Sequence, residues 1–383
     1  MGHEVRGAVA VGFEAVREEF ASVLAEEPVE PGAQLAVYVG GRQVVDLWGG
    51  QDVAGDSLFA LYSSAKGAAH LVLALLVQDG VLDLDRPVLD WWPEFAAEGK
   101  GRVTLRQLAS HQAGVVGVEG GFTAVELADD RLLAERLAGQ KPYWEPGAAY
   151  GYHAWVIGAL IGEVVRRATG RTVQELFEER VRAPYGLDFH LGLPEALESR
   201  CLPVQPATQP APEQAVPAPD SLTGVAFNLN ATPPTDLVAF GNTRAVRAQG
   251  PASSGGVGNA RGLARMYAAA ISEVDGLPRL LAPTVVAEFA AVQMRGTDLV
   301  TGELDHFAVG FEAQGVRYPV LGPDAFGHSG AVGAQSFADP GSGVAYSYTR
   351  RRFQPQGGGA AENTRLIDAV MRAARRNQSA TRP

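Results

Sequence analysis

The sequence contains almost no cysteine and no spacing typical of metal ligands. Its single cysteine, Cys201, excludes a disulfide framework within the chain and a cysteine-based metal site. The seven histidines form no H-E-x-x-H motif or comparable arrangement. We therefore expect neither a metal ion nor a cofactor to take part in the function.

The chain also lacks long apolar runs and a surplus of positive charge. The apolar segment from Leu71 to Val77 is too short to cross a bilayer, and the N-terminus carries no charged-then-apolar secretory signal. The formal net charge of −11 opposes binding to a phosphate backbone and gives no attraction to anionic lipid. We accordingly expect a cytoplasmic protein with no nucleic-acid or membrane partner, and the sequence gives no indication of its oligomeric state.

What the chain does contain is material for a large core: 383 residues, of which 46% are hydrophobic. An amphipathic helix is expected over 13–24. The β-rich runs 35–39 and 44–48, on either side of Gly40-Gly41, predict a hairpin. Because two strands alone are marginally stable, this hairpin is expected to join strands from elsewhere in one antiparallel sheet.

Those further strands are expected near the C-terminus, and the middle of the chain reads as helical. Predicted strands cover 306–312, 333–338 and 344–349, with a closing helix over 363–375. Predicted helices cover 68–77, 105–111, 154–168 and 259–267, and the six prolines within 202–219 predict an extended excursion. The sequence thus predicts an α+β fold with a discontinuous α/β domain (1–60 plus 250–383), a mostly helical domain (61–249) and an active site at their interface.

The first stretch that carries chemistry is Ser63-Ser64-Ala65-Lys66, at the start of an apolar run. If the run is helical, Ser63 and Lys66 lie one turn apart on the same face. A serine hydroxyl needs a nearby proton acceptor to act as a nucleophile, and a lysine serves when burial lowers its pKa. The competing interpretation, a helix-capping serine beside a solvated lysine, is the commoner one for such a short motif taken alone.

The second stretch places Tyr152 after a Pro146-Gly147 turn and just before a helix. A phenol beside a lysine ammonium has its phenolate stabilised and can move protons near neutral pH. Without companions, Tyr152 is equally well interpreted as an ordinary half-buried aromatic residue.

The third stretch is Gly327-His328-Ser329-Gly330-Ala331, in which glycine lets a substrate approach the backbone. It narrowly misses the G-x-S-x-G nucleophile motif and has no strand–turn–helix around it, so we reject Ser329 as the nucleophile. A glycine-rich turn with a structural His328 is the alternative interpretation. An N–H group here, with that of Ser63, would supply two donors for an oxyanion.

In this order, S-x-x-K, a tyrosine after Pro-Gly and a His-Ser-Gly motif resemble the serine β-lactamase and penicillin-binding-protein superfamily. The spacing is similar to that of the class C-like branch, which includes family VIII carboxylesterases, D-aminopeptidases, nylon-oligomer hydrolases and some acyltransferases. The resemblance covers nearly the whole chain. It implies the β-lactamase-like, or transpeptidase, fold, with an antiparallel sheet flanked by helices and an inserted helical domain.

The resemblance also implies a role for each matched residue. Ser63 becomes the nucleophile, Lys66 and Tyr152 the base system, and the N–H groups of Ser63 and Ala331 the oxyanion site. The remaining matched positions are expected to line the substrate pocket, namely His328, Ser329, Gly330 and His153. Two departures, the missing asparagine in Tyr152-His153-Ala154 and histidine in place of the lysine of β-lactamases at 328, weaken recognition of an anionic lactam.

The sequence therefore predicts a serine hydrolase that attacks a small ester or amide through an acyl-enzyme on Ser63, most simply a carboxylesterase. One alternative is a transacylase that passes the acyl group to an amine or alcohol, which would be a second, acceptor substrate. A weak β-lactamase and a non-enzymatic ligand binder are the remaining alternatives. Retention of Ser63, Lys66 and Tyr152 together argues against a binder.

Overall fold

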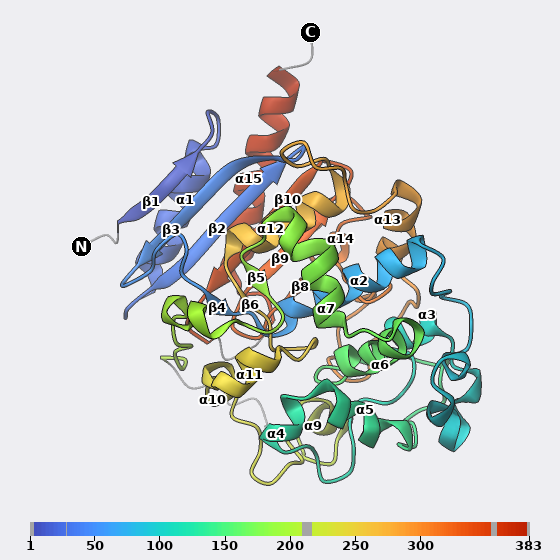
Figure 1. Ribbon diagram of the computed structural model, residues 1–383. Coiled ribbons are helices and arrows are strands. Elements are labelled where there is room, and N and C mark those ends of the chain that lie inside the picture. The colour runs from blue at the N-terminus through green and yellow to red at the C-terminus, as the bar shows by residue number, and fades with distance from the viewer. Residues whose placement is uncertain (1–3, 28, 209–216, 354–357, 381–383) are drawn as a thin grey trace.

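The computed structural model describes residues 4–27, 29–208, 217–353 and 358–380. Its main feature is a seven-stranded antiparallel sheet in the order β1-β3-β2-β10-β9-β8-β7 (Figure 1). The strands are β1 (Val5–Val9), β2 (Gly32–Val39), β3 (Arg42–Gly50), β7 (Glu312–Ala313), β8 (Phe326–Ser329), β9 (Gln335–Asp339) and β10 (Val344–Arg350). The pairing of β2 with β10 confirms that the front hairpin joins the C-terminal strands.

Alternating side chains along the strands give the sheet two buried faces. On one face Leu35 and Val37 pack with α1 (Glu14–Glu26) and α15 (Glu362–Ala380). On the other, Ala36 and Tyr38 pack with α12 (Ala260–Ile271), which Asn259 caps by accepting from the N–H of Gly262. Figure 1 shows α1 and α15 on one side of the sheet and α12 on the other.

The remaining helices lie on the β8 side of the sheet, beside it or below it in Figure 1. They are α2 (Lys66–Gln78), α3 (Leu105–Ala109), α4 (Ala124–Leu127), α5 (Asp130–Ala138), α6 (Ile157–Thr169), α7 (Val173–Phe177), α8 (Ala183–Tyr185), α9 (Leu222–Ala226), α10 (Leu237–Asn242), α11 (Arg244–Gln249), α13 (Pro283–Ala290) and α14 (Gln314–Arg317). A small second sheet consists of β4 (Phe59–Ala60), β6 (Val257–Gly258) and β5 (Phe189–His190), in that order. It joins three segments that are far apart in the sequence. The division into domains at 60/61 and 249/250 stays a prediction.

Two predicted elements differ from the structure, and one strand was not predicted. The strand expected over 306–312 is reduced to β7, because the chain turns at Ala308–Gly310, where Gly310 adopts a φ of 79°. The helix expected from residue 154 begins at Ile157, and the carbonyl of Ala154 instead accepts a hydrogen bond from Lys66. The edge strand β1 was not predicted, because it is short and largely exposed and so lacks an alternating apolar pattern.

Within the described residues, no helix combines the length and the apolar character needed to cross a bilayer. The proline-rich excursion predicted over 202–219 lies partly outside those residues, at 209–216. In its described part, the backbone of Gln205 forms hydrogen bonds with the backbone of Arg351 and Phe353.

Candidate active site

Ser63 lies on a short 3₁₀ helix, Tyr62–Ala65, that runs directly into α2. Tyr62 has a φ of 48°, in the left-handed region where a bulky residue is strained. Its hydroxyl donates to the carbonyl of Leu237 at 2.7 Å, which anchors this turn to α10. The strained turn therefore fixes the direction in which Ser63 enters the site.

Lys66, the first residue of α2, is fully buried next to Ser63. Its Nζ lies 3.0 Å from Ser63 Oγ, 2.7 Å from the carbonyl oxygen of Ala154 and 2.8 Å from that of Ser253. Burial lowers the pKa of Lys66 to about 7. A neutral amine donates its two hydrogens to the two carbonyls, which leaves its lone pair directed at the hydroxyl of Ser63.

Tyr152 completes a three-membered contact, since its hydroxyl lies 2.8 Å from Ser63 Oγ. The expected stabilisation of its phenolate is wrong for this structure, because burial raises the pKa of Tyr152 well above its ordinary value. The phenol therefore keeps its proton and donates to Ser63. Lys66 is the group whose pKa suits a base near neutral pH.

Two residues that the sequence did not reveal hold Tyr152 in place. Asp298 accepts from the backbone N–H of Tyr152 at 3.2 Å and from those of Val300 and Thr301. The ring of Phe307 stacks on that of Tyr152, with centroids 5.4 Å apart and an interplanar angle of 18°. Asp298 lies in an irregular segment with neither helical nor strand periodicity. Phe307 falls within the strand expected over 306–312, a pattern that indicates burial but not a contact with Tyr152.

The predicted oxyanion donors, the N–H groups of Ser63 and Ala331, donate to no protein acceptor in the described part of the chain. They are thus available to a ligand. Gly330 packs closely here: a Cβ on it would lie 2.4 Å from the carbonyl oxygen of Leu61. The absent side chain at Gly330 therefore brings β8 against the turn that carries Ser63.

Of the other predicted pocket residues, His328 stands next to Tyr152, with ring centroids 6.0 Å apart. The hydroxyl of Ser329 donates to Glu312 at 2.6 Å. This contact agrees with its rejection as the nucleophile. Burial lowers the pKa of His328 to about 4, so its ring is neutral at pH 7.

His153 is buried, and both of its ring nitrogens are occupied by backbone groups. Its Nε2 accepts from the N–H of Val115 at 3.2 Å, and its Nδ1 lies 2.7 Å from the carbonyl oxygen of Gly151. Its own N–H donates to Nδ1 of His111. These contacts tie the Tyr152 segment to the 111–115 loop, and they leave His153 no free nitrogen for a substrate.

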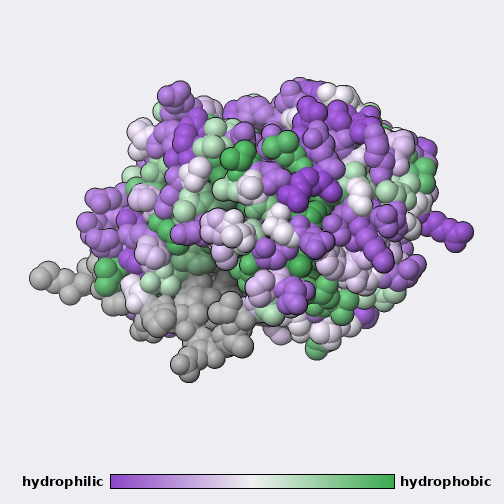
Figure 2. Space-filling model, turned by 90° about the horizontal axis from the view of Figure 1, so that it is seen from below, coloured by the Kyte–Doolittle hydropathy of each residue, from purple (hydrophilic) through white to green (hydrophobic). Residues whose placement is uncertain are grey.

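No group of three histidine, cysteine, aspartate or glutamate side chains in the described ranges is arranged to hold a metal ion. The chemistry that the site offers is instead a nucleophile, a base and hydrogen-bond donors. On the face seen in Figure 2, hydrophilic residues cover much of the surface and hydrophobic residues appear in patches among them.

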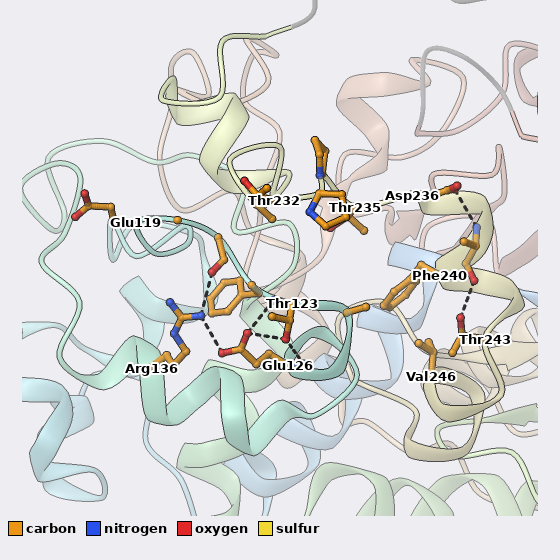
Figure 3. A pocket seen from close by; sticks show the side chains of 18 residues that line it. Glu119, Thr123, Glu126, Arg136, Thr232, Thr235, Asp236, Phe240, Thr243 and Val246 are labelled. Carbon is orange, nitrogen blue, oxygen red and sulfur yellow. Dashed lines mark hydrogen bonds and ion pairs between the residues drawn. The ribbon is translucent and has the colours of Figure 1, made fainter.

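A separate cavity of about 570 Å³ lies between the 119–126 segment and the 231–246 segment (Figure 3). Its lining includes none of the residues Ser63, Lys66 and Tyr152. The guanidinium of Arg136 is paired with Glu126 and the carbonyl of Gly121, and Asp236 caps α10. Arg136, Glu126 and Asp236 are thus partnered within the protein. Phe122 and Phe240 contribute apolar surface to the cavity.

Comparison with known proteins agrees with this geometry. The family model described as Beta-lactamase matches residues 20–371. The chain is 32% identical to "Esterase/beta-lactamase LipL" of Mycobacterium tuberculosis, over 92% of this chain and 84% of that protein. Among solved structures, EstA from Arthrobacter nitroguajacolicus Rue61a is 41% identical with a TM-score of 0.90, covering 98% of this chain and 99% of that one. A family VIII carboxylesterase is 34% identical with a TM-score of 0.87, covering 97% and 100%.

Proposed function

Because this chain belongs to the beta-lactamase family, we propose that it hydrolyses carboxylic esters through an acyl-enzyme on Ser63. It is a serine hydrolase of the carboxylesterase type with the β-lactamase fold, as its likeness to EstA and to a family VIII carboxylesterase indicates. The substrate class is therefore an ester; that it is a small molecule, and that the enzyme works in the cytoplasm, are parts of the proposal.

In acylation, Ser63 Oγ attacks the ester carbonyl carbon while its proton passes to the lone pair of Lys66 Nζ. The oxyanion that forms accepts hydrogen bonds from the N–H groups of Ser63 and Ala331. When the tetrahedral intermediate collapses, the carbon–oxygen bond to the alcohol breaks. The alcohol leaves with the proton that Lys66 took, and the Tyr152 hydroxyl, which also contacts Ser63 Oγ, helps to guide that transfer.

In deacylation the same groups act in reverse on a water molecule. Lys66, again neutral, takes a proton from the water, whose oxygen attacks the acyl carbon. Collapse of the second tetrahedral intermediate breaks the bond to Ser63 Oγ, which recovers the proton. The net reaction consumes one ester and one water and releases an acid and an alcohol.

The observation that supports this proposal most strongly is the fully buried Lys66. Two carbonyl oxygens hold its Nζ, which lies 3.0 Å from Ser63 Oγ. A buried lysine without a carboxylate partner is costly to keep in a merely structural role. Its placement provides a base where a serine nucleophile needs one.

The test is turnover of a p-nitrophenyl butyrate ester by the wild type and by Ser63→Ala and Lys66→Ala. We expect each substitution to lower kcat by at least about 10³-fold, because each removes a group that the acyl transfer requires. Circular dichroism of both variants controls for folding. Near-wild-type rates in either folded variant would overturn the assignment.

The acceptor is tested by adding an amine to the same assay. With water as the acceptor, turnover stays unchanged when the amine is added. An acyl-enzyme that persists in water and is discharged by the amine, giving the amide, would instead identify a transacylase.

A further inference from the structure

A buried carboxylate that the acyl transfer does not use lies behind His328. The side chain of Glu312, on β7, is 5% exposed, and its Oε1 lies 3.2 Å from Nδ1 of His328. The hydroxyl of Ser329 donates to Oε1 at 2.6 Å. The backbone N–H of Ser329 and the side-chain amide of Gln314 donate to Oε2 at 3.1 and 2.9 Å.

Positive groups on neighbouring segments keep this carboxylate charged. Arg317 NH1 lies 3.6 Å from Oε2 of Glu312, and Nε2 of His306 lies 4.0 Å from Oε1. Glu303 holds Nδ1 of His306 on its other side at 2.8 Å. Burial alone would raise the pKa of Glu312, but His328, His306, Arg317 and the hydrogen bond from Ser329 together hold it at about 2, so the carboxylate is ionised throughout the physiological range.

Glu312 and the carbonyl of Ser329 together decide which nitrogen of His328 carries the hydrogen. Nδ1 of His328 lies between two acceptors, the Glu312 carboxylate and the carbonyl oxygen of Ser329 at 2.9 Å. In a neutral imidazole, a nitrogen between two acceptors is the one that is protonated. Nε2 therefore has a bare lone pair, and it has no hydrogen-bond partner among the described residues.

We propose that Glu312 is a positioning residue that holds His328 in the Nδ1–H tautomer, so that Nε2, which is buried and has no partner among the described residues, keeps its lone pair in the ring beside Tyr152. The ring of His328 lies beside that of Tyr152, whose hydroxyl contacts Ser63. A lone pair in this ring repels a carboxylate on an ester bound at Ser63 and does not repel a neutral ester. The inference rests on the proposed function and assigns it neutral esters as substrates.

The substitution Glu312→Gln tests this mechanism with little change of shape. The N–H of Ser329 is a fixed donor at the Oε2 position, so the amide oxygen of the new side chain takes that position. Its NH₂ group then faces Nδ1 of His328 and donates to it. Nδ1 then has one acceptor beside it, the Ser329 carbonyl, and one donor, the new amide. We expect the donated hydrogen bond to shift the ring to the Nε2–H tautomer, which makes Nε2 a donor.

The matched control is Glu303→Gln. Glu303 belongs to the same cluster and contacts His306 and Arg317, but it has no contact with His328. The substitution Glu303→Gln removes one negative charge, as Glu312→Gln does, and should leave the tautomer of His328 unchanged.

The direct readout is the tautomer itself, from a long-range ¹H–¹⁵N correlation spectrum of the histidine-labelled protein at pH 7. The signal of His328 is identified by its loss in His328→Gln. We expect Nδ1–H in the wild type and in Glu303→Gln, and Nε2–H in Glu312→Gln. A wild-type ring that is charged or protonated at Nε2 would overturn the proposal, and so would an unchanged tautomer in Glu312→Gln. If the variant does not fold, the wild-type spectrum alone still tests the proposal.

The second readout is selectivity, measured as kcat/KM. Neutral p-nitrophenyl butyrate is compared with the mono-p-nitrophenyl ester of succinate and with 4-carboxyphenyl butyrate, which carry a carboxylate on the acyl and alcohol sides. We expect Glu312→Gln, but not Glu303→Gln, to reduce the preference for the neutral ester about tenfold against at least one of them. An unchanged preference against both overturns the assignment of neutral substrates, whereas failure of the wild type to hydrolyse any ester overturns the proposed function and leaves the tautomer result standing.

Discussion

At the scale of single residues, the site depends on how burial divides the protons between Lys66 and Tyr152. Burial disfavours the charged form of each group, so it lowers the pKa of the lysine and raises that of the phenol. The lysine becomes a neutral base and the tyrosine a persistent donor. Both groups contact Ser63 Oγ, one as the base and the other as a hydrogen-bond donor. The sequence alone could only group them together as the base system.

This division predicts the pH dependence of the reaction. The active form of Lys66 is the neutral amine, whose fraction rises as the pH increases through the pKa of about 7. We expect kcat/KM for p-nitrophenyl butyrate to rise about tenfold per pH unit below that value and to level off above it. A profile that is flat between pH 5 and 9, after correction for spontaneous hydrolysis, would exclude Lys66 as the base.

The residue scale also shows what the sequence made predictable. Ser63, Lys66 and Tyr152 were identified because each lies in a short local motif, and the structure brings their reactive atoms together. Asp298 and Glu312 were not identified, because each acts through partners from other segments of the chain. A lone acidic residue carries no local signal of such contacts, whether it lies in an irregular segment, as Asp298 does, or on a two-residue edge strand, as Glu312 does.

At the scale of elements, α6 is the support on which the lysine's carbonyl partners rest. Gly158, in the first turn of α6, donates its N–H to Ser253 Oγ at 2.7 Å, and a Cβ there would lie 2.4 Å from the backbone nitrogen of Ser253. The carbonyl of the same Ser253 accepts from Lys66. The close approach of α6 to the backbone of Ser253 therefore depends on the absence of a side chain at Gly158.

We expect Gly158→Ala to displace the Ser253 backbone, lowering kcat about tenfold or more and destabilising the protein by about 1–3 kcal/mol. The control is Gly162→Ala, one turn later in α6, where the nearest atom to a new Cβ is Val173 Cγ2 at 3.9 Å. Higher helix propensity should make that variant slightly more stable, by about 0.5–1 kcal/mol, with unchanged kcat. Equal behaviour of the two variants in urea unfolding and steady-state kinetics would contradict this account of α6.

Elements were predicted best where they are long and amphipathic and worst where tertiary contacts set their ends. The front hairpin, α12 and α15 follow from periodicity and capping. The late start of α6 at Ile157 does not, since the carbonyl of Ala154 accepts from Lys66, a residue far away in the sequence. The short strand β7 is a similar case, because it forms by pairing with β8 at the edge of the sheet.

At the scale of the whole molecule, a buried ionic cluster joins the beginning and the end of the chain. Glu27, directly after α1, lies 3.3 Å from Arg350 and 2.8 Å from Arg352, both at the end of β10. Arg350 also pairs with Glu362 at the start of α15. The side chains of Glu27, Arg350 and Arg352 are 12%, 7% and 9% exposed, so none of these charges is well solvated.

We expect Glu27→Ala to lower the free energy of unfolding by about 3–5 kcal/mol, because it leaves two buried guanidinium groups without their shared carboxylate. The neighbouring Glu26→Ala removes an exposed pair with Arg365, whose side chains are 57% and 44% exposed, and should cost about 0.2–1 kcal/mol. Urea denaturation of both variants makes the comparison. A smaller loss for Glu27→Ala than for Glu26→Ala would show that this cluster does not hold the two ends of the chain together.

The central claim, an acyl-enzyme on Ser63, is tested most directly by intact mass spectrometry during turnover of p-nitrophenyl butyrate, quenched with acid at short times. The account predicts a mass increase of one butyryl group, mapped by peptide analysis to Ser63 and absent from Ser63→Ala. A folded, active enzyme that never carries the adduct, or that carries it on another residue, would contradict it.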